Sequence, residues 1–223
     1  MTSSPFILFV ALAGIAVASA KDFENLNFDE GTLSPGPIND GPQPIGTYLP
    51  GWTAHMGPQE LTEVYFGYQS SAYGRVAVSP QERRPFTFEG RYGLLLQGGP
   101  EFLSSSPAVP ASISQVGLIP AGTKSLLFRS DIASPTEVRI NGKAISLYAV
   151  EKVSFTTIYG VDVSDFAGQE VDLSFVNYAN PAEPGFAAID SLQFSSSVTV
   201  PEPSTCALLG SGGLALLWAV RRR

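Results

Sequence analysis

Short runs of alternating apolar and polar residues follow one another along most of the chain, with Gly, Pro or Ser between them. Such punctuated runs are typical of β-strands. A longer stretch rich in Pro and Gly, residues 31–51, predicts a loop. The predicted strands are residues 22–30, a short strand opening at Trp52, Glu63–Gln69, Gly74–Ser79, Tyr92–Gln97, Ser112–Ile119, Thr123–Asp131, Phe155–Val163, Glu170–Tyr178 and Phe186–Phe194.

The clearest local signal is Asn141-Gly142, which lies between apolar runs and predicts a type I′ hairpin over Glu137–Tyr148. Ser164–Gly168 is the one stretch that predicts a helical turn. The runs named above make about ten strands, and no window of this region keeps a helical period. The fold class is therefore all-β, with the strands arranged as a two-sheet antiparallel β-sandwich.

The beginning of the chain departs from this strand pattern. Phe6–Val17 is a twelve-residue apolar run, which is the length of a signal-peptide core and too short to span a bilayer. Ala18 and Ala20 enclose Ser19 in a small-x-small cleavage site, so residues 1–20 predict a signal peptide for the Sec export machinery. Because no Lys or Arg precedes the apolar run, a retained membrane anchor is the alternative.

The end of the chain is a second apolar segment, Thr205–Val220, which has sixteen residues and no charge. As a helix it would span about 24 Å, somewhat less than the roughly 30 Å hydrocarbon core, and local thinning or snorkelling of the terminal arginines could make up the difference. Trp218 and the basic cluster Arg221, Arg222 and Arg223 suit a membrane interface with the arginines in the cytoplasm. The alternative is a buried C-terminal core helix, although residues that are apolar all round suit it poorly.

Immediately before this segment stands the box Val200-Pro201-Glu202-Pro203-Ser204, in which the prolines prevent a helix from starting before Ser204. Box, apolar stretch and terminal basic cluster together resemble the PEP-CTERM sorting signal of bacterial exported proteins. The resemblance implies recognition by an exosortase, a membrane cysteine transpeptidase-like enzyme, and cleavage near the box. It also implies a bacterium that makes exopolysaccharide.

The chain divides accordingly into five parts. These are a signal peptide (1–20), a β-sandwich domain (21–195), a linker with the sorting box (196–204), a transmembrane helix (205–220) and a cytoplasmic basic cluster (221–223). The protein is expected to be exported to the cell envelope or extracellular matrix, with at least transient anchoring in the inner membrane by the C-terminal helix.

Composition narrows the class of partner. The chain has 13 Lys and Arg against 20 Asp and Glu, and three of the 13 are the terminal arginines, so the part between the signals carries a net charge of −10. This charge argues against nucleic acid, anionic lipid and polyanions as partners. Cys206 is the one cysteine and lies in the tail, so the domain can have neither disulfides nor thiolate metal sites.

Several fragments of the central region resemble the galactose-binding-like jelly-roll family, which includes many carbohydrate-binding modules. They are Asn27-Phe28-Asp29, Pro50-Gly51-Trp52, Gly93-Leu94-Leu95-Leu96, Ser112-Ile113-Ser114-Gln115 and Ala188-Ile189-Asp190-Ser191-Leu192. The resemblance implies that the first and last strands lie near each other and that acidic residues there hold a structural Ca²⁺. The matching residues are Asp29 and Asp190, with Glu30 as a third candidate. Alternatively, Asp29 caps a turn and Asp190 is a solvated residue at a strand end.

Candidate ligand residues are aromatic. Tyr65, Tyr68 and Tyr73 crowd one stretch together with Phe66, and Gln69 and Arg75 add polar groups of the kind that sugar sites combine with aromatic platforms. Since alternate strand residues must face the core, core packing is the competing role for each of these rings, as it is for Trp52.

No catalytic residue is predicted. His55 is the one histidine and has no serine elbow or domain cysteine to complete a triad. The first hypothesis is therefore a non-enzymatic exported protein that contacts polysaccharide. A surface glycan hydrolase using a carboxylate pair, such as Glu60 with Glu63 or Glu82 with Glu89, is the second. A permanently anchored single-pass structural protein is the third.

Overall fold

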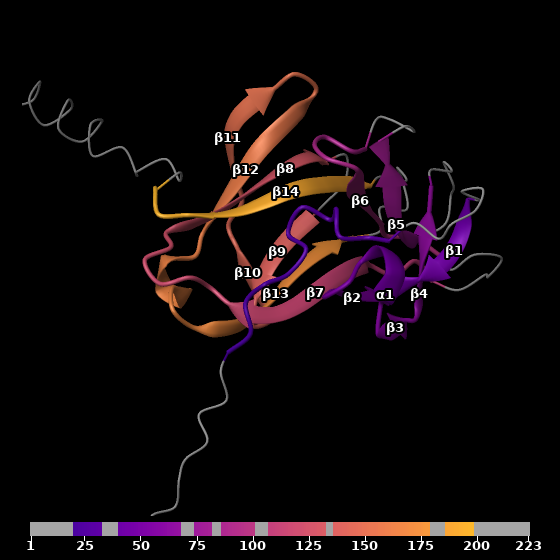
Figure 1. Cartoon of the computed structure of the whole chain (residues 1–223), viewed down its shortest axis with the longest axis horizontal. Helices are drawn as coiled ribbons and strands as arrows, with labels where there is room; N and C mark the ends of the chain where they lie inside the picture. The colour runs from indigo at the N-terminus through magenta and orange to yellow at the C-terminus, as the bar shows by residue number, and fades with distance from the viewer. Residues whose placement is uncertain are drawn as a thin grey trace, which may run out of the picture.

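The computed structural model describes residues 20–32, 40–67, 74–81, 86–100, 107–132, 136–178 and 186–198. Within these residues the chain forms two facing β-sheets (Figure 1). The predicted all-β, two-sheet sandwich is confirmed.

The larger sheet has eight strands in the part that the structure describes. Their spatial order is β1 (Gly41–Pro44), β4 (Glu63–Phe66), β5 (Arg75–Pro80), β6 (Tyr92–Gln97), β14 (Ala187–Ser195), β8 (Ser125–Ile132), β12 (Thr156–Asp162) and β11 (Tyr148–Val153). Pairing between β4 and β5 is parallel, and the other described pairs of this sheet are antiparallel. The last strand of the fold, β14, therefore lies in the middle of the sheet.

The smaller sheet has six described strands, all paired antiparallel. Their order is β10 (Lys143–Ile145), β9 (Thr136–Ile140), β13 (Glu170–Asn177), β7 (Ala111–Leu118), β2 (Thr53–Met56) and β3 (Gln59–Leu61). Two short helices complete the described elements, α1 (Ile45–Tyr48) and the 3₁₀ helix η2 (Ser164–Phe166).

The main core fills the space between the two sheets. Phe128 of β8 and Phe175 of β13 meet edge to face across it, with ring centres 5.2 Å apart, and both side chains are buried. Trp52 packs on Phe28 at 5.7 Å and donates its indole N–H to the carbonyl of Asn25. The prediction that Trp52 packs in the core is confirmed, since only 5% of it is exposed.

A smaller apolar cluster covers the outer face of the eight-stranded sheet. Leu95 of β6 packs there with Ala77, Phe86 and Ala188, whereas its neighbours Leu94 and Leu96 face the main core. Strand β6 is thus buried on both faces, which accounts for its uninterrupted apolar sequence. A Cβ at Gly93 would lie 2.3 Å from the Phe86 carbonyl oxygen, so the covering segment needs glycine at that position to approach the sheet.

Residues with left-handed backbone conformation explain one correct and one wrong prediction. Asn141 (φ 51°) and Gly142 (φ 76°) form the expected turn between β9 and β10. The strand predicted over residues 22–30 is wrong. Asp22 makes one isolated bridge to Leu118, and the left-handed residues Asn25 (φ 50°) and Phe28 (φ 60°) turn the chain back on itself.

Other predicted strands are confirmed within a few residues of their ends, and Tyr92–Gln97 matches at both ends. The predicted helical turn at Ser164–Gly168 is present as η2. Strands β1, β3 and β11 were not predicted, and β1 and α1 lie inside the stretch expected to be a loop. All three are edge strands, and none of their side chains is fully buried, so burial imposes no clear apolar pattern on their sequences.

Because Phe175 is fully buried between the sheets, we expect Phe175→Ala to lower the free energy of unfolding by about 3–5 kcal/mol. Val116 is 56% exposed on β7, so the control Val116→Ala should cost less than about 1 kcal/mol. Urea unfolding followed by tryptophan fluorescence measures both. Equal losses for the two variants would contradict this core assignment.

Candidate functional site

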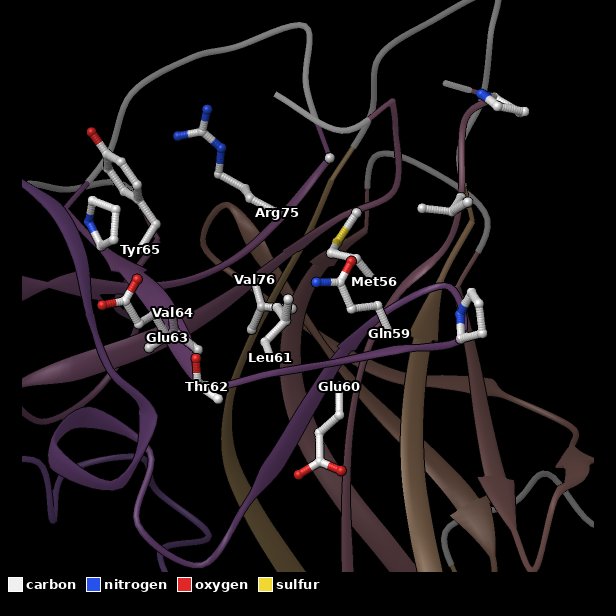
Figure 2. Close-up of a pocket in the computed structure, with 15 residues that line it drawn as sticks. Met56, Gln59, Glu60, Leu61, Thr62, Glu63, Val64, Tyr65, Arg75 and Val76 are labelled. Carbon is white, nitrogen blue, oxygen red and sulfur yellow. The ribbon is translucent and has the colours of Figure 1, made fainter. Parts of the chain in front are cut away.

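A pocket of about 650 Å³ opens where the chain crosses from one sheet to the other. Thr62 joins the edge strand β3 of the six-stranded sheet to β4 of the eight-stranded sheet, and β5 forms a further wall. Figure 2 shows Tyr65 and Arg75 on one side of this pocket and Met56 and Gln59 on the other. We call it the crossover pocket.

Tyr65 provides the aromatic surface of the crossover pocket. Its side chain is half-buried and packs against the apolar cluster on the outer face of the sheet. The guanidinium carbon of Arg75 lies 4.8 Å from the ring centre, a cation–π distance that fixes the orientation of the ring. Of the three predicted ligand tyrosines, Tyr65 therefore lines a pocket, while Tyr68 and Tyr73 lie outside the described residues. Phe66 is fully buried in the core, as alternation along β4 requires.

Carboxylates also border the crossover pocket. Glu60 and Glu63 are both exposed and come from one continuous segment, β3 to β4. In Figure 2 their side chains point in different directions. Hydrolysis of a glycosidic bond needs two carboxyl groups on opposite sides of that bond. The arrangement of Glu60 and Glu63 therefore gives the hydrolase hypothesis little support. Glu82, of the other candidate pair, lies outside the described residues.

The predicted metal residues Asp29 and Asp190 both bind one segment, Phe88–Tyr92. Asp190 Oδ2 accepts the backbone N–H groups of Phe88 (2.9 Å) and Glu89 (3.0 Å). Asp29 Oδ1 accepts those of Arg91 (2.6 Å) and Tyr92 (3.0 Å). We call this arrangement the carboxylate clamp. It ties the start of the domain and its last strand to the segment that leads into β6.

Gly90 is at the centre of the clamped segment. It has a left-handed backbone (φ 67°), and a Cβ there would lie 1.9 Å from an oxygen of Asp29. The clamp therefore depends on glycine for both backbone conformation and space. On the opposite side, Ser191 (φ 55°) lies in a register shift between Asp190 and Gln193 of β14, which lets Asp190 face the clamped segment while Leu192 returns to the core.

The environment of Asp190 is unusual for a carboxylate. The residue is 0% exposed, so it is not the solvated strand-end residue of the alternative interpretation. Burial raises the pKa of Asp190 to about 6, even though the N–H groups of Glu89 and Phe88 act in the opposite direction, and the nearby charge of Asp29 raises it further. The two carboxylates are thus close enough to repel each other.

A hollow of about 530 Å³ lies beside the clamp and is lined by Asn27, Asp29, Glu89, Gly90, Ser191, Leu192 and Gln193. Glu89 reaches Ser191 Oγ at 3.2 Å and Arg129 at 3.7 Å. Asp29 Oδ2 and Asp190 Oδ1 have weaker partners, Asn27 Nδ2 at 3.2 Å and Ser191 Oγ at 3.3 Å. These two oxygens fit a hard cation in part, since each retains lone pairs. Among the described residues no cluster of three or more His, Cys, Asp or Glu side chains forms a metal site.

A polar cluster on the outer face of the six-stranded sheet was not predicted. Arg139 donates to Glu137 Oε2 (2.9 Å) and to the hydroxyl of Tyr178, and that hydroxyl in turn donates to Glu137 (3.0 Å). Burial raises the pKa of Tyr178. His55 lies half-buried on the same face, opposite Ser112 and Glu60 in the neighbouring strands. Alternation of polar and apolar residues along a strand can indicate which of these residues share the outer face. Which of them meet across neighbouring strands depends on the register of strands that are distant in sequence, so sequence reasoning did not find the cluster.

The two predicted export signals fall mainly outside the described residues. Ala18 and the tail residues Val200, Pro201, Glu202, Pro203, Ser204, Trp218, Arg221, Arg222 and Arg223 are outside, whereas Ala20 is the first described residue. None of the helices in the described part of the chain is long and apolar enough to cross a bilayer. The predicted span 205–220 is outside that part.

Comparison with solved structures gives two similar folds. One is the enzymatically active domain of tailspike protein 4 from bacteriophage CBA120 (13% identity, TM-score 0.39), matched over 65% of this chain and 19% of that chain. The other is TmCBM61 in complex with β-1,4-galactotriose (12% identity, TM-score 0.38), matched over 79% of this chain and 99% of that chain. The chain thus spans about a fifth of the tailspike chain's length. No curated protein matches the sequence.

Comparison with protein families gives a match at the end of the chain. The matched family is described as the PEP-CTERM protein-sorting motif, and the match covers residues 199–223. This region includes the box Val200–Ser204, the apolar stretch and the terminal arginines on which the sequence prediction rested. Such a motif implies export and processing by an exosortase. The chain therefore carries a PEP-CTERM protein-sorting motif at its C-terminal end.

Proposed function

We propose that this protein is a non-enzymatic component of the cell envelope or extracellular matrix, delivered by the sorting motif and associated with polysaccharide through its β-sandwich. The motif at residues 199–223 is the observation that carries the proposal. In this proposal the Sec machinery exports the chain and removes residues 1–20. The apolar segment 205–220 then holds it in the inner membrane until an exosortase cleaves near Ser204.

The crossover pocket is the proposed place of contact with polysaccharide. It combines an oriented ring (Tyr65) with a guanidinium (Arg75) and side chains that can accept or donate hydrogen bonds (Gln59, Thr62). Sugar recognition uses this combination, because apolar ring faces pack on C–H groups while polar groups bind hydroxyls. The pocket lies on the surface between strands of both sheets, where a chain-like ligand has access.

We further propose that the hollow beside the carboxylate clamp holds a structural Ca²⁺. Asp29 Oδ2 and Asp190 Oδ1 are the carboxylate oxygens that would bind it. A cation there would offset the repulsion between Asp29 and Asp190 and would favour the ionised form of Asp190. Its role would be to stabilise the segment that precedes β6, and it would supply no chemistry.

Processing of the tail tests the sorting part of the proposal. Intact-mass measurement of the exported protein should give a chain that begins near Lys21 and ends near Ser204. Replacement of both box prolines, Pro201→Ala with Pro203→Ala, should leave the full tail in place, because the extended box would be lost. An end at Arg223 in the unaltered protein would instead support the permanently anchored alternative.

Ligand binding tests the polysaccharide part. On a glycan array and with polysaccharide isolated from the producing cells, Tyr65→Ala should weaken binding roughly tenfold, which corresponds to about 1.4 kcal/mol. Tyr148→Ala is the matched control, since Tyr148 is also half-buried but belongs to β11, the far edge strand of the same sheet. Equal binding by the three proteins would remove the crossover pocket as the contact. Release of reducing ends from the polysaccharide would favour the hydrolase instead.

The pKa of Asp190 tests the calcium site. Without Ca²⁺ its folded-state pKa of about 6 exceeds the unfolded value of 3.8, so the contribution of Asp190 to the free energy of unfolding should fall by about 3 kcal/mol as pH rises from 4 to 6 and then level off. With millimolar Ca²⁺ we expect a lower pKa, a flatter pH profile and a higher Tm. Carboxyl-carbon NMR titration and thermal unfolding measure these quantities.

Asp190→Asn is the control for this experiment, since it should remove the part of the pH dependence between 4 and 6 that Asp190 causes, together with the response to Ca²⁺. Asp29→Asn keeps the buried carboxylate and should retain a pH dependence of smaller size. Identical profiles of the unaltered protein with and without Ca²⁺ would exclude the metal site while leaving the carboxylate clamp intact.

A further inference from the structure

Both ends of the described domain are hydrogen-bonded to the same connection, between β7 and β8. Leu118 N–H, at the end of β7, donates to the Lys21 carbonyl (2.8 Å). Lys124 N–H, just before β8, donates to the Ser195 carbonyl (2.8 Å). Chain entry and chain exit therefore lie at one end of the sandwich, which we call the terminal pole: Lys21, Asp22, Pro120–Lys124 and Ser195–Val198. Figure 1 shows the β7–β8 connection and the yellow end of β14 together on one side of the molecule.

The chain stays attached to the fold beyond the end of β14. Ser125 is 0% exposed, and its hydroxyl donates to the Ser197 carbonyl at 2.9 Å. Ser197 N–H in turn donates to Ser195 Oγ at 3.1 Å. The last of these attachments is thus only two residues before position 199, where the sorting motif begins.

This attachment limits the reach of the tail. Between Ser197 and the first residue of the apolar segment, Thr205, there are seven residues, Val198–Ser204. A fully extended chain covers at most about 3.3–3.6 Å per residue, so these seven residues span no more than about 25 Å. While the apolar segment is in the membrane, the terminal pole must therefore stay within roughly that distance of its surface.

The crossover pocket lies at the other end of the sandwich. Strand β7 begins at Ala111, next to Met56 of β2, and ends at Leu118, which is hydrogen-bonded to Lys21 of the terminal pole. Met56 and Val109 both line the pocket, and Gly57 N–H donates to the Pro110 carbonyl there. From Ala111 to Leu118, β7 separates the two ends by about 23 Å at the usual strand rise of 3.2–3.4 Å.

We infer that the terminal pole is the surface that meets the membrane-embedded processing enzyme, and that the crossover pocket faces away from the membrane at that stage. The inference rests on the proposed function, because it takes the tail as the substrate of an exosortase. The partner is a membrane enzyme whose exposed face must accept exposed polar groups such as Lys21, Lys124 and Asp22 beside the cleavage site. The pole and the sorting box are then recognised together.

Site-specific photo-crosslinking in the full chain tests this orientation. The crosslinker replaces Ala121, which is exposed in the terminal pole, or Gln59, which is exposed at the crossover pocket. Both chains are produced in cells whose exosortase binds but does not cleave. We expect at least tenfold more crosslinked enzyme from position 121 than from position 59. Equal yields, or more from position 59, would overturn the inference.

A longer linker tests whether the short tail is what keeps the terminal pole near the enzyme. Twenty Gly and Ser residues placed after Ser197 should reduce crosslinking from position 121 at least fivefold, while the active enzyme still cleaves the tail. An unchanged yield would show that the short length of the tail does not hold the terminal pole at the enzyme, and would overturn the inference.

The cleavage results separate this inference from the proposed function. Absence of cleavage in every chain, with and without the insertion, would remove the proposed function and the inference together. Normal cleavage with equal crosslinking at both positions would remove the inference alone.

Discussion

The eight-stranded sheet is held together by β14, the last strand in the sequence. Strand β14 pairs with β6 on one side and with β8 on the other, so without it the sheet would divide into β1-β4-β5-β6 and β8-β12-β11. It also supplies Ile189 and Leu192 to the main core and Asp190 to the carboxylate clamp. Because the final strand is central rather than peripheral, the domain cannot close until nearly all of the chain before the sorting motif is available.

This constraint links the fold to the position of the tail. A strand in the middle of a sheet is held by backbone hydrogen bonds on both sides, and its end is therefore a firm point of attachment. The attachment continues through Ser195 and Ser197, whose carbonyls are bound by Lys124 and Ser125. Folding of the domain consequently limits how far the sorting box can be from the fold, whereas a peripheral last strand could detach and give the box a longer reach.

The sequence was most informative where structure is local. Asn141-Gly142 determines its own turn, and the short apolar run Tyr92–Gln97 suits the strand buried on both faces that it forms. Residues 22–30 alternate like a strand but turn at Asn25 and Phe28, because Phe28 packs on Trp52 and the backbone must bend to bring it there. Apolar spacing alone does not distinguish these two outcomes.

The candidate sites were predictable to different degrees. The resemblance to the jelly-roll family paired Asp29 with Asp190, and in the structure both residues bind the segment 88–92. Their partners, the N–H groups of residues 88–92, are 62 to 102 positions away in sequence, and no local pattern indicates such contacts. Tyr65 and Arg75 were both candidates on composition, but their contact follows from the parallel pairing of β4 with β5.

The domain contains no cysteine, so it is stabilised without disulfide bonds. The one cysteine is in the tail, so the domain needs no oxidative step after export. Segments that are distant in sequence are instead joined by buried polar side chains. Asn177 Oδ1 accepts the Gly98 N–H, and the Gln115 side chain accepts the Glu24 N–H and donates to the Glu24 carbonyl. These contacts join residues 79 and 91 positions apart, and they form only when both sheets are in register. We therefore expect closure by β14 and formation of these contacts to be one cooperative event, which also attaches Ser197 to the terminal pole, two residues before the sorting motif begins.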